Sequence, residues 1–305
     1  MTTSTRPSPI VVWVEALRPK TLGASLCPVL MGAALAWQAG SFEWIPVLAA
    51  FAGACLLQIA SNFANDLFDG LHGTDSGVRL GPARAVGSGW VTPRAMATAL
   101  LLVLAIAVVP AVYLVRREGA AFAWIAVAGA ISAVGYTAPP LRIGYRGLGD
   151  AFVFVFFGPV AVVGTVAACS GQWPMDALVA GIAPGAIGMA LLATNNLRDR
   201  VGDAASGKRT LVVRFGERFG RAQIVLCHAA AALVPVLLWW RFGLPAGVML
   251  AGALSVAFAP ASIAVLRGRD GADLNRTLAA FGIQLYLYGA AFVLGMWLGG
   301  GAVQP

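Results

Sequence analysis

Two segments of this chain contain the motif Asn-x-x-x-Asp, followed by a further aspartate three or four residues later. The first is SNFANDLFDGLHGTD (residues 61–75) and the second is TNNLRDRVGDAASGKRT (residues 194–210). In chain order, the members are Asn62, Asp66 and Asp69 in the first segment and Asn195, Asp199 and Asp203 in the second. If each segment is helical, each set shares one helix face, because residues four or seven positions apart lie above one another.

These oxygen-bearing side chains predict a magnesium site. Carboxylates four residues apart repel each other slightly in a bare helix, so a cation must make the arrangement favourable. Ligand sets of oxygen atoms suit Mg²⁺, which binds one or two carboxylates together with substrate phosphates. Zinc favours His and Cys ligands, and only His72 is near. The alternative is that individual aspartates are helix caps or surface charges, which does not explain why the pattern occurs twice.

Basic residues follow the acidic segments, many of them beside glycine in RLGPAR, GYRGLGD and SGKRT. They are Arg79, Arg84, Arg142, Arg146, Lys208 and Arg209. Arginine forks match phosphate oxygens, and glycine lets backbone amides approach an anion closely. Together with the acidic segments, these loops predict a site for a diphosphate held by Mg²⁺. Any single arginine remains open to a simpler explanation, as a determinant of membrane topology.

The elements that must position these residues are transmembrane helices. Of the 305 residues, 59% are hydrophobic and 11% are charged, and the mean hydropathy is +0.80. Apolar runs of about 20 residues, each able to cross a bilayer, recur along the chain. We expect an all-α polytopic membrane protein with about nine spans, at 22–40, 44–64, 95–115, 121–138, 150–169, 176–196, 221–240, 245–266 and 278–299.

The distribution of positive charge predicts the orientation of the chain. All but Arg116, Arg117 and Arg241 of the 21 basic residues fall on the N-terminal side of the nine expected spans. Basic loops stay in the cytoplasm, which places the N-terminus and the polar clusters inside and the C-terminus outside. Because this charge lies in short loops, a nucleic-acid partner is a poor explanation for the net charge of +8. The N-terminus shows no signal-peptide cleavage pattern.

Longer matches extend around these motifs, in LRPKTLGASLCPVLMGAAL, YTAPPLRIGYRGLGDAFVFVFFGPVAVVGT and NNLRDRVGDAASGKRTLVVRFG. With them, the sequence resembles the UbiA superfamily of intramembrane aromatic prenyltransferases. Within that superfamily it is most similar to the MenA branch, the 1,4-dihydroxy-2-naphthoate polyprenyltransferases. The broader superfamily has a further aspartate four residues after the one matched by Asp69, where this chain has Gly73 and reaches its next acid at Asp75. The resemblance therefore favours Asp66, Asp69, Asp199 and Asp203 over Asp75.

The resemblance implies one domain at residues 21–300 after a cytoplasmic segment 1–20, with nine helices around a central cavity and an active site closed by cytoplasmic loops. It also implies Mg²⁺-dependent transfer of a polyprenyl group from an allylic diphosphate to 1,4-dihydroxy-2-naphthoate, with decarboxylation to demethylmenaquinone, in the cell inner membrane. The residues assigned to Mg²⁺ and diphosphate are Asn62, Asp66, Asp69, Asn195, Asp199 and Asp203, and those assigned to phosphate oxygens are Arg79, Arg84, Lys208, Arg209, Arg142 and Arg146.

Several alternatives stay open at this point. Arg18 and Lys20 either face the acceptor carboxylate or anchor the first span. The residues alone do not separate the naphthoate from 4-hydroxybenzoate, homogentisate, a tetrapyrrole or a secondary-metabolite aromatic. A transporter is a further class, although its polar residues would be expected near the middle of the membrane and not on one face. Donor chain length and oligomeric state are not encoded in any motif.

Overall fold

The protein is all-helical in the residues that the computed structural model describes, 7–72, 80–81 and 84–299. The α-helices are α1 (Pro9–Leu17), α2 (Gly23–Gln38), α3 (Trp44–Leu71), α4 (Pro93–Glu118), α5 (Ala120–Gly135), α6 (Gly149–Phe156), α7 (Pro159–Ser170), α8 (Met175–Ala180), α9 (Ile182–Ala205), α10 (Leu211–Phe215), α11 (Glu217–Phe242), α12 (Met249–Leu266) and α13 (Leu274–Gly299). Short 3-10 turns are η1 (Pro19–Thr21), η2 (Ile143–Arg146), η3 (Ala246–Val248) and η4 (Gly271–Asp273). The absence of strands from these ranges confirms the expected fold class.

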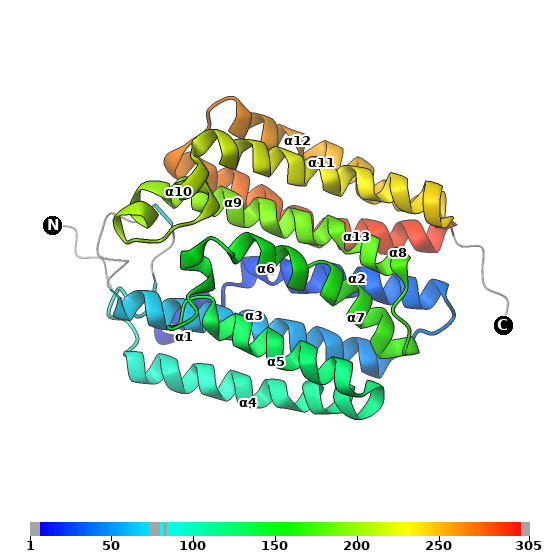
Figure 1. Ribbon diagram of the computed structural model, residues 1–305, viewed down its shortest axis with the longest axis horizontal. Coiled ribbons are helices and arrows are strands. Elements are labelled where there is room, and N and C mark those ends of the chain that lie inside the picture. Colours follow the sequence, from blue (N-terminus) through cyan, green and yellow to red (C-terminus); the bar gives the residue numbers. More distant parts are fainter. Residues whose placement is uncertain (1–6, 73–79, 82–83, 300–305) are drawn as a thin grey trace.

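Seven helical stretches in the described part of the chain are long and apolar enough to cross a membrane. The other two expected spans correspond to α2 and α5, apolar helices of 16 residues each. Sixteen residues cover about 24 Å, somewhat less than a hydrocarbon core of about 30 Å. Helix α1 lies at one end of the bundle and α13 finishes at the other (Figure 1), which requires an odd number of crossings. A total of nine stays a prediction.

The expected span 150–169 is two helices, α6 and α7, set end to end. Pro159 begins α7 and has no N–H to continue a helix from α6. Gly158, which precedes it, lies against the α8–α9 junction, where an added Cβ would approach the Gly181 carbonyl oxygen to 2.5 Å. The chain therefore bends here because proline interrupts the hydrogen-bond ladder and glycine permits close backbone packing.

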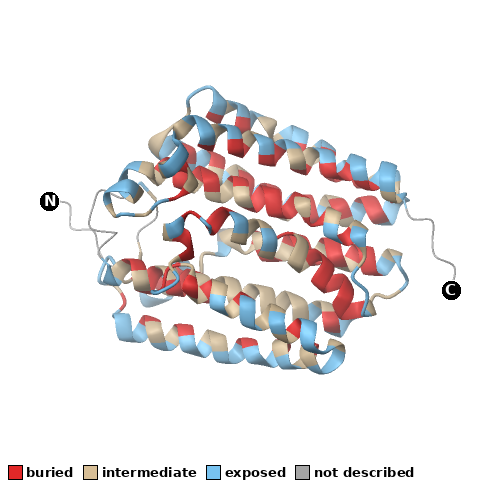
Figure 2. Cartoon of the chain, in the orientation of Figure 1, coloured by how far each residue is buried: buried red, intermediate tan, exposed pale blue. Residues whose placement is uncertain are grey.

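Burial differs sharply between the centre and the edge of the bundle. In the stretch Met175–Ala205, which comprises α8 and α9, 67% of the most apolar part is buried, against 22% in α4. Figure 2 shows the same contrast, with buried residues along α9 and exposed ones along α4. The exposed side chains of the outer helices include Leu101 and Val109 on α4 and Leu226 and Trp240 on α11. Large apolar side chains on the outside are expected where the surrounding solvent is lipid.

The bundle consists of two groups of helices. In the first, α3 packs against α4 and α5, and in the second, α9 packs against α6, α11 and α13. Helix α2 contacts both groups, through α3 and α13. The C-terminal ends of α3 and α9 lie at the same end of the bundle, together with α1 and α10 (Figure 1). Both acidic segments are therefore at one end of the molecule.

Candidate active site

Helix α3 continues to Leu71, which meets the condition for Asn62, Asp66 and Asp69 to share one helix face. Asp66 is 3% exposed and accepts hydrogen bonds from the backbone N–H groups of Ala85, at 3.0 Å, and Val86, at 2.8 Å. Both of its carboxylate oxygens are used in this way. Asp66 therefore holds the backbone of the segment before α4 against the end of α3.

Asp69 lies one turn further along and contacts side chains instead. It forms an ion pair with Arg84 and accepts a hydrogen bond of 2.7 Å from the Tyr145 hydroxyl. Arg84 also donates to the carbonyl oxygen of Asn65 at 2.8 Å. The structure thus brings together Asp69 and one of the predicted phosphate-binding arginines.

Asn62 lies at the packing of α3 against the N-terminal segment. Its amide nitrogen donates to the carbonyl oxygen of Leu17 at 2.9 Å and to the Thr21 hydroxyl at 3.4 Å. Its amide oxygen accepts a bond of 3.5 Å from Gln58. These contacts tie the Leu17–Thr21 segment to α3, so the contacts of Asn62 differ from those of Asp69 despite their shared helix.

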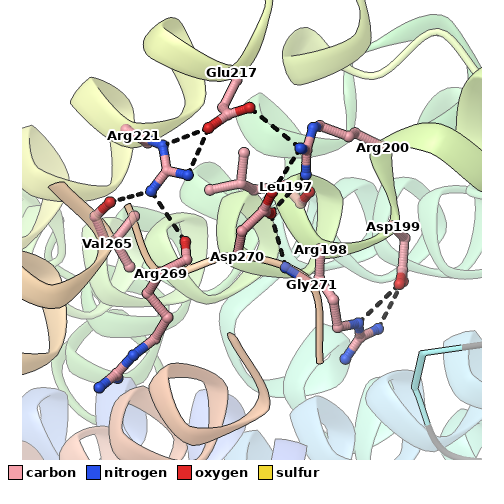
Figure 3. A network of polar contacts seen from close by, with 10 residues as sticks. All are labelled: Leu197, Arg198, Asp199, Arg200, Glu217, Arg221, Val265, Arg269, Asp270 and Gly271. Atoms are coloured by element: carbon pink, nitrogen blue, oxygen red, sulfur yellow. Dashed lines mark hydrogen bonds and ion pairs between the residues drawn. The ribbon is translucent and has the colours of Figure 1, made fainter. Parts of the chain in front are cut away.

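The second acidic segment is helical to Ala205 and is organised by Arg198. The Arg198 guanidinium binds both carboxylate oxygens of Asp199, at 2.8 and 2.6 Å. It also donates to the side-chain oxygen of Asn195 at 2.6 Å. Figure 3 shows the Arg198–Asp199 pair apart from the ion-pair network around Arg200 and Asp270. Two of the predicted ligands on α9 therefore share one arginine.

Asp203 lies one turn beyond Asp199 and faces Lys208. The Lys208 ammonium nitrogen is 3.3 Å from an Asp203 carboxylate oxygen, and the Lys208 backbone N–H donates to the Asp203 carbonyl at 2.8 Å. The other carboxylate oxygen of Asp203 is buried and has no hydrogen-bond partner among the described residues. A buried acceptor without a donor costs about 1–3 kcal/mol, so this oxygen is ready to accept a ligand.

Tyr145 joins the two acidic helix ends. Its hydroxyl binds Asp69 of α3, and its carbonyl oxygen accepts a hydrogen bond of 2.9 Å from the backbone N–H of Arg209, just after α9. The connection after α5 thus reaches both α3 and the segment that follows α9.

Tyr136 packs on the same connection. An added Cβ on Gly149 would meet its hydroxyl oxygen at 2.5 Å, and one on Gly144 would meet its ring at 2.7 Å. The glycines of the GYRGLGD segment therefore allow this segment to lie directly against the Tyr136 ring.

The other predicted basic residues take several positions. Arg142 contacts His72 at the end of α3 and lies 5.5 Å over the Tyr145 ring, with its backbone in the left-handed region (φ 43°). Arg146 donates to the Pro140 carbonyl at 2.9 Å and is exposed, and the Arg209 side chain is also exposed. Arg18 is the second non-glycine residue with positive φ in the described chain. Arg79 and Asp75 lie outside the described residues, as does the side chain of Lys20.

A model of the UbiA prenyltransferase family matches residues 25–287 of this chain. The chain belongs to the UbiA prenyltransferase family. It is therefore a prenyltransferase and, with its apolar spans, a multi-pass membrane protein.

Relatives of this family member match over almost its whole length. It is 34% identical over 287 residues to a Mycobacterium tuberculosis (strain ATCC 25618 / H37Rv) protein named 1,4-dihydroxy-2-naphthoate octaprenyltransferase, covering 92% of this chain and 94% of that protein. It is also 34% identical over 303 residues to a protein of that name from Escherichia coli (strain K12), covering 94% and 95%. A UbiA homolog from Archaeoglobus fulgidus, solved bound to DMAPP and Mg²⁺, aligns with a TM-score of 0.64 and 15% identity over 94% of this chain and 99% of that one.

The donor set of this UbiA family member fits a magnesium ion bound together with a diphosphate. Within the described ranges, no group of three or more His, Cys, Asp or Glu side chains lies close enough together to hold an ion without other ligands. Magnesium keeps several waters and binds proteins through one or two carboxylates plus substrate phosphates, so it needs no such group. The unpartnered buried oxygen of Asp203 and the carboxylates of Asp69 and Asp199 are suitable donors.

The structure adds two residues that the sequence interpretation did not assign to the site, Tyr145 and Arg198. Tyr145 lies in the matched GYRGLGD segment, but nothing in its spacing indicates contact with α3. Arg198 lies inside the second acidic segment, between Asn195 and Asp199. Its position three residues after Asn195 on one helix is the signal that indicates contact with the predicted ligands.

Proposed function

We propose that this chain transfers a polyprenyl group from an allylic diphosphate to 1,4-dihydroxy-2-naphthoate. The observation that carries this proposal is the 34% identity to relatives named for the same acceptor, which extends over more than nine tenths of each chain. The polar end of the bundle is consistent with the donor, because it combines carboxylates with arginine and lysine side chains.

In the proposed reaction, the ring carbon that bears the carboxylate of the naphthoate forms a bond to the allylic carbon of the donor. The allylic C–O bond breaks, and its electron pair leaves with the diphosphate. The bond from the same ring carbon to the carboxylate carbon also breaks, and its electron pair restores the aromatic ring as CO₂ departs. The direct product is the quinol form of demethylmenaquinone.

The basic residues of the site bind the departing diphosphate. Arg84 and Lys208 each contact a carboxylate in the structure and lie near the end of α3 and just after α9, respectively. Their positive charge stabilises the negative charge that develops on the leaving group, which is worth most where water is excluded. Asp69, Asp199 and Asp203 are the proposed ligands of Mg²⁺, with Asp66 and the amides Asn62 and Asn195 as further candidates. When bound, Mg²⁺ supplies Lewis-acid stabilisation of the diphosphate.

Tyr145 and Asp66 have positioning roles in this proposal. The Tyr145 hydroxyl orients Asp69, and Asp66 holds the backbone next to Arg84. The apolar helices around the site exclude water that would quench an allylic cation, and they accommodate a polyprenyl chain. We further propose that this end of the bundle lies on the cytoplasmic side of a cell membrane, because the basic loops cluster there.

A direct test is prenyl transfer by the purified full-length chain in lipid nanodiscs, with one labelled prenyl diphosphate and a panel of acceptors. We expect Mg²⁺-dependent prenylation of 1,4-dihydroxy-2-naphthoate and release of CO₂. Selective use of 4-hydroxybenzoate or homogentisate would overturn the proposed acceptor while leaving the family assignment intact. Equal turnover with and without EDTA would overturn the proposed role of the metal.

A further inference from the structure

Arg198 is a buried cation inside the candidate active site. Its exposed fraction is 5%, although its guanidinium keeps its positive charge in any protein environment. Such a charge is tolerated only where it is paired and its N–H groups are bonded. Four hydrogen bonds satisfy it, two to Asp199, one to Asn195 and one of 2.7 Å to the side-chain oxygen of Asn275.

The surroundings of Arg198 come from three separate parts of the chain. Asn275 at the start of α13 accepts from Arg198 and donates to the carbonyl oxygen of Leu80 at 3.1 Å. Gly81 lies directly against the guanidinium, because an added Cβ there would be 2.7 Å from an Arg198 nitrogen. Leu80 and Gly81 therefore lie over the arginine, and the absence of a side chain at Gly81 permits that close approach.

The charge balance around Arg198 depends on one residue. Among the described side chains, Asp199 is its only carboxylate partner, and the other two acceptors are neutral amides. Asp199 itself is more open, with 25% of its side chain exposed. A cation that took both oxygens of Asp199 would leave Arg198 buried without a negative partner, which is strongly unfavourable.

We propose that Arg198 is an exchangeable counter-ion that couples metal binding to diphosphate binding. In the free protein it neutralises Asp199. When a divalent cation binds Asp199, the guanidinium transfers to an oxygen of the diphosphate, whose geometry suits an arginine fork. This inference rests on the proposed function, since it takes Asp199 as a metal ligand and a diphosphate as part of the substrate.

A coupling of this kind is reciprocal and measurable. If diphosphate tightens the binding of a divalent cation by some factor, the cation tightens the binding of diphosphate by the same factor. We expect a factor of about 10 or more in the wild-type protein, within the usual range for linked sites. Loss of the internal counter-ion has two opposite effects: the metal alone binds more tightly, because no arginine competes for Asp199, and the coupling shrinks.

The experiment measures Mn²⁺ binding to the full-length chain in nanodiscs by electron paramagnetic resonance, with and without inorganic pyrophosphate. In Arg198→Gln, we expect the affinity for Mn²⁺ alone to rise several-fold and the enhancement by pyrophosphate to fall below about threefold. A purely structural role for Arg198 predicts a different result, with both Mn²⁺ affinities weakened together or unchanged. Either of those outcomes, or a wild-type protein in which pyrophosphate leaves Mn²⁺ affinity unchanged, overturns the inference.

Arg200 provides a matched control on the same helix. It forms a comparable two-point ion pair with Asp270, at 2.6 Å for both contacts, on the other side of α9 (Figure 3). Arg200→Gln should leave the pyrophosphate enhancement at its wild-type value, and loss of that enhancement in Arg200→Gln would contradict the assignment to Arg198.

Arg198→Lys covers the case in which the glutamine variant does not fold. Lysine keeps the charge but lacks the fork, so the coupling should be smaller than in the wild type, and an unchanged value would contradict the proposal. Failure of the proposed function has a separate signature, namely wild-type protein that binds no Mn²⁺ even with pyrophosphate present.

Discussion

The two acidic helix ends share a sequence pattern but make different kinds of contact. At the end of α3, Asp66 accepts hydrogen bonds from two backbone N–H groups. At the end of α9, Asp199 and Asp203 face the cationic side chains of Arg198 and Lys208. A backbone contact is released only by reshaping a loop, whereas an ion pair can exchange one partner for a ligand. Although both helix ends contain the motif Asn-x-x-x-Asp, their aspartates therefore do not all have the same function.

Asp69 shows that the division does not simply follow the helix. It lies on α3, yet its partners are the side chains of Arg84 and Tyr145, so its environment resembles that of the α9 carboxylates. Asn62 lies two turns earlier and is bonded to the N-terminal segment, and Asp66 lies one turn earlier and is bonded to the segment before α4. The last turn of α3 and the end of α9 therefore supply the carboxylates that can exchange a side-chain partner for a ligand, Asp69, Asp199 and Asp203. The preceding turns of α3 hold these carboxylates in place.

The largest effect is expected for Asp203→Asn. This change removes the negative charge of one proposed Mg²⁺ ligand. We therefore expect prenyl transfer to fall by about 100- to 1000-fold, the scale of losing one electrostatic contact in an active site. Stability should change little, about 0.5 kcal/mol or less, because one oxygen has no partner to lose and Lys208 reaches water. Parallel turnover assays and thermal melts in nanodiscs check both statements. A large fall in melting temperature would mean that Asp203 stabilises the fold, as Asn62 and Asp66 do.

Asp66→Asn should show the opposite balance. An amide offers only one acceptor oxygen, so one of the buried N–H groups of Ala85 and Val86 loses its partner, at a cost of about 1–3 kcal/mol. Displacement of the neighbouring Arg84 should lower activity by about 10- to 100-fold.

Limited trypsin digestion of the Asp66→Asn protein tests the structural part, since cleavage after Arg84 should become faster than in Asp203→Asn. If digestion and melting temperature match the wild type while activity is lost, Asp66 acts as a ligand and the division between the two helix ends fails.

A smaller effect is expected for Tyr145→Phe. The change removes the hydroxyl that orients Asp69 and keeps the ring, which costs about 1.4 kcal/mol, or tenfold, in the KM for the prenyl diphosphate. Tyr288→Phe is the matched control, because the buried Tyr288 hydroxyl donates 2.9 Å to the Ala231 carbonyl between α13 and α11. That control should lower stability and leave KM unchanged, and a KM that rises equally in both variants would remove Tyr145 from the site.

Much of the fold follows from the sequence because membrane spans are set by length and hydropathy. The helical continuation of α3 to Leu71 and of α9 to Ala205 meets the condition under which the amide and carboxylate residues of each segment share one face. The break between α6 and α7 was missed, because the apolar run continues through Gly158 and hydropathy does not detect a bend.

The partners of the site residues could not be predicted in the same way. Spacing along a helix says which residues share a face, but the Asp69–Tyr145 and Arg198–Asn275 contacts join residues 76 and 77 positions apart. Such contacts depend on how separate connections fold over the helix ends. The sequence therefore indicates which residues do chemistry, and tertiary packing decides which of them are free to exchange partners.

The smallest effect is expected on the other side of α9, where Arg200 and Asp270 form an ion pair outside the site. Residues 198 and 200 are separated by about 200° around a helix, so the two arginines serve opposite faces. The hydrogen bond from Arg200 holds the pKa of Asp270 below its ordinary value, which means that this pair stabilises the fold above about pH 4 and loses that contribution as the pH falls through the lowered pKa. Because Asp270 is partly exposed, the contribution should stay below about 1 kcal/mol. Asp270→Asn should therefore melt slightly below the wild type at pH 7, and the difference should shrink as the pH falls below about 4 and through the lowered pKa of Asp270. A difference that stays constant as the pH falls would mean that the asparagine disturbs packing and not charge.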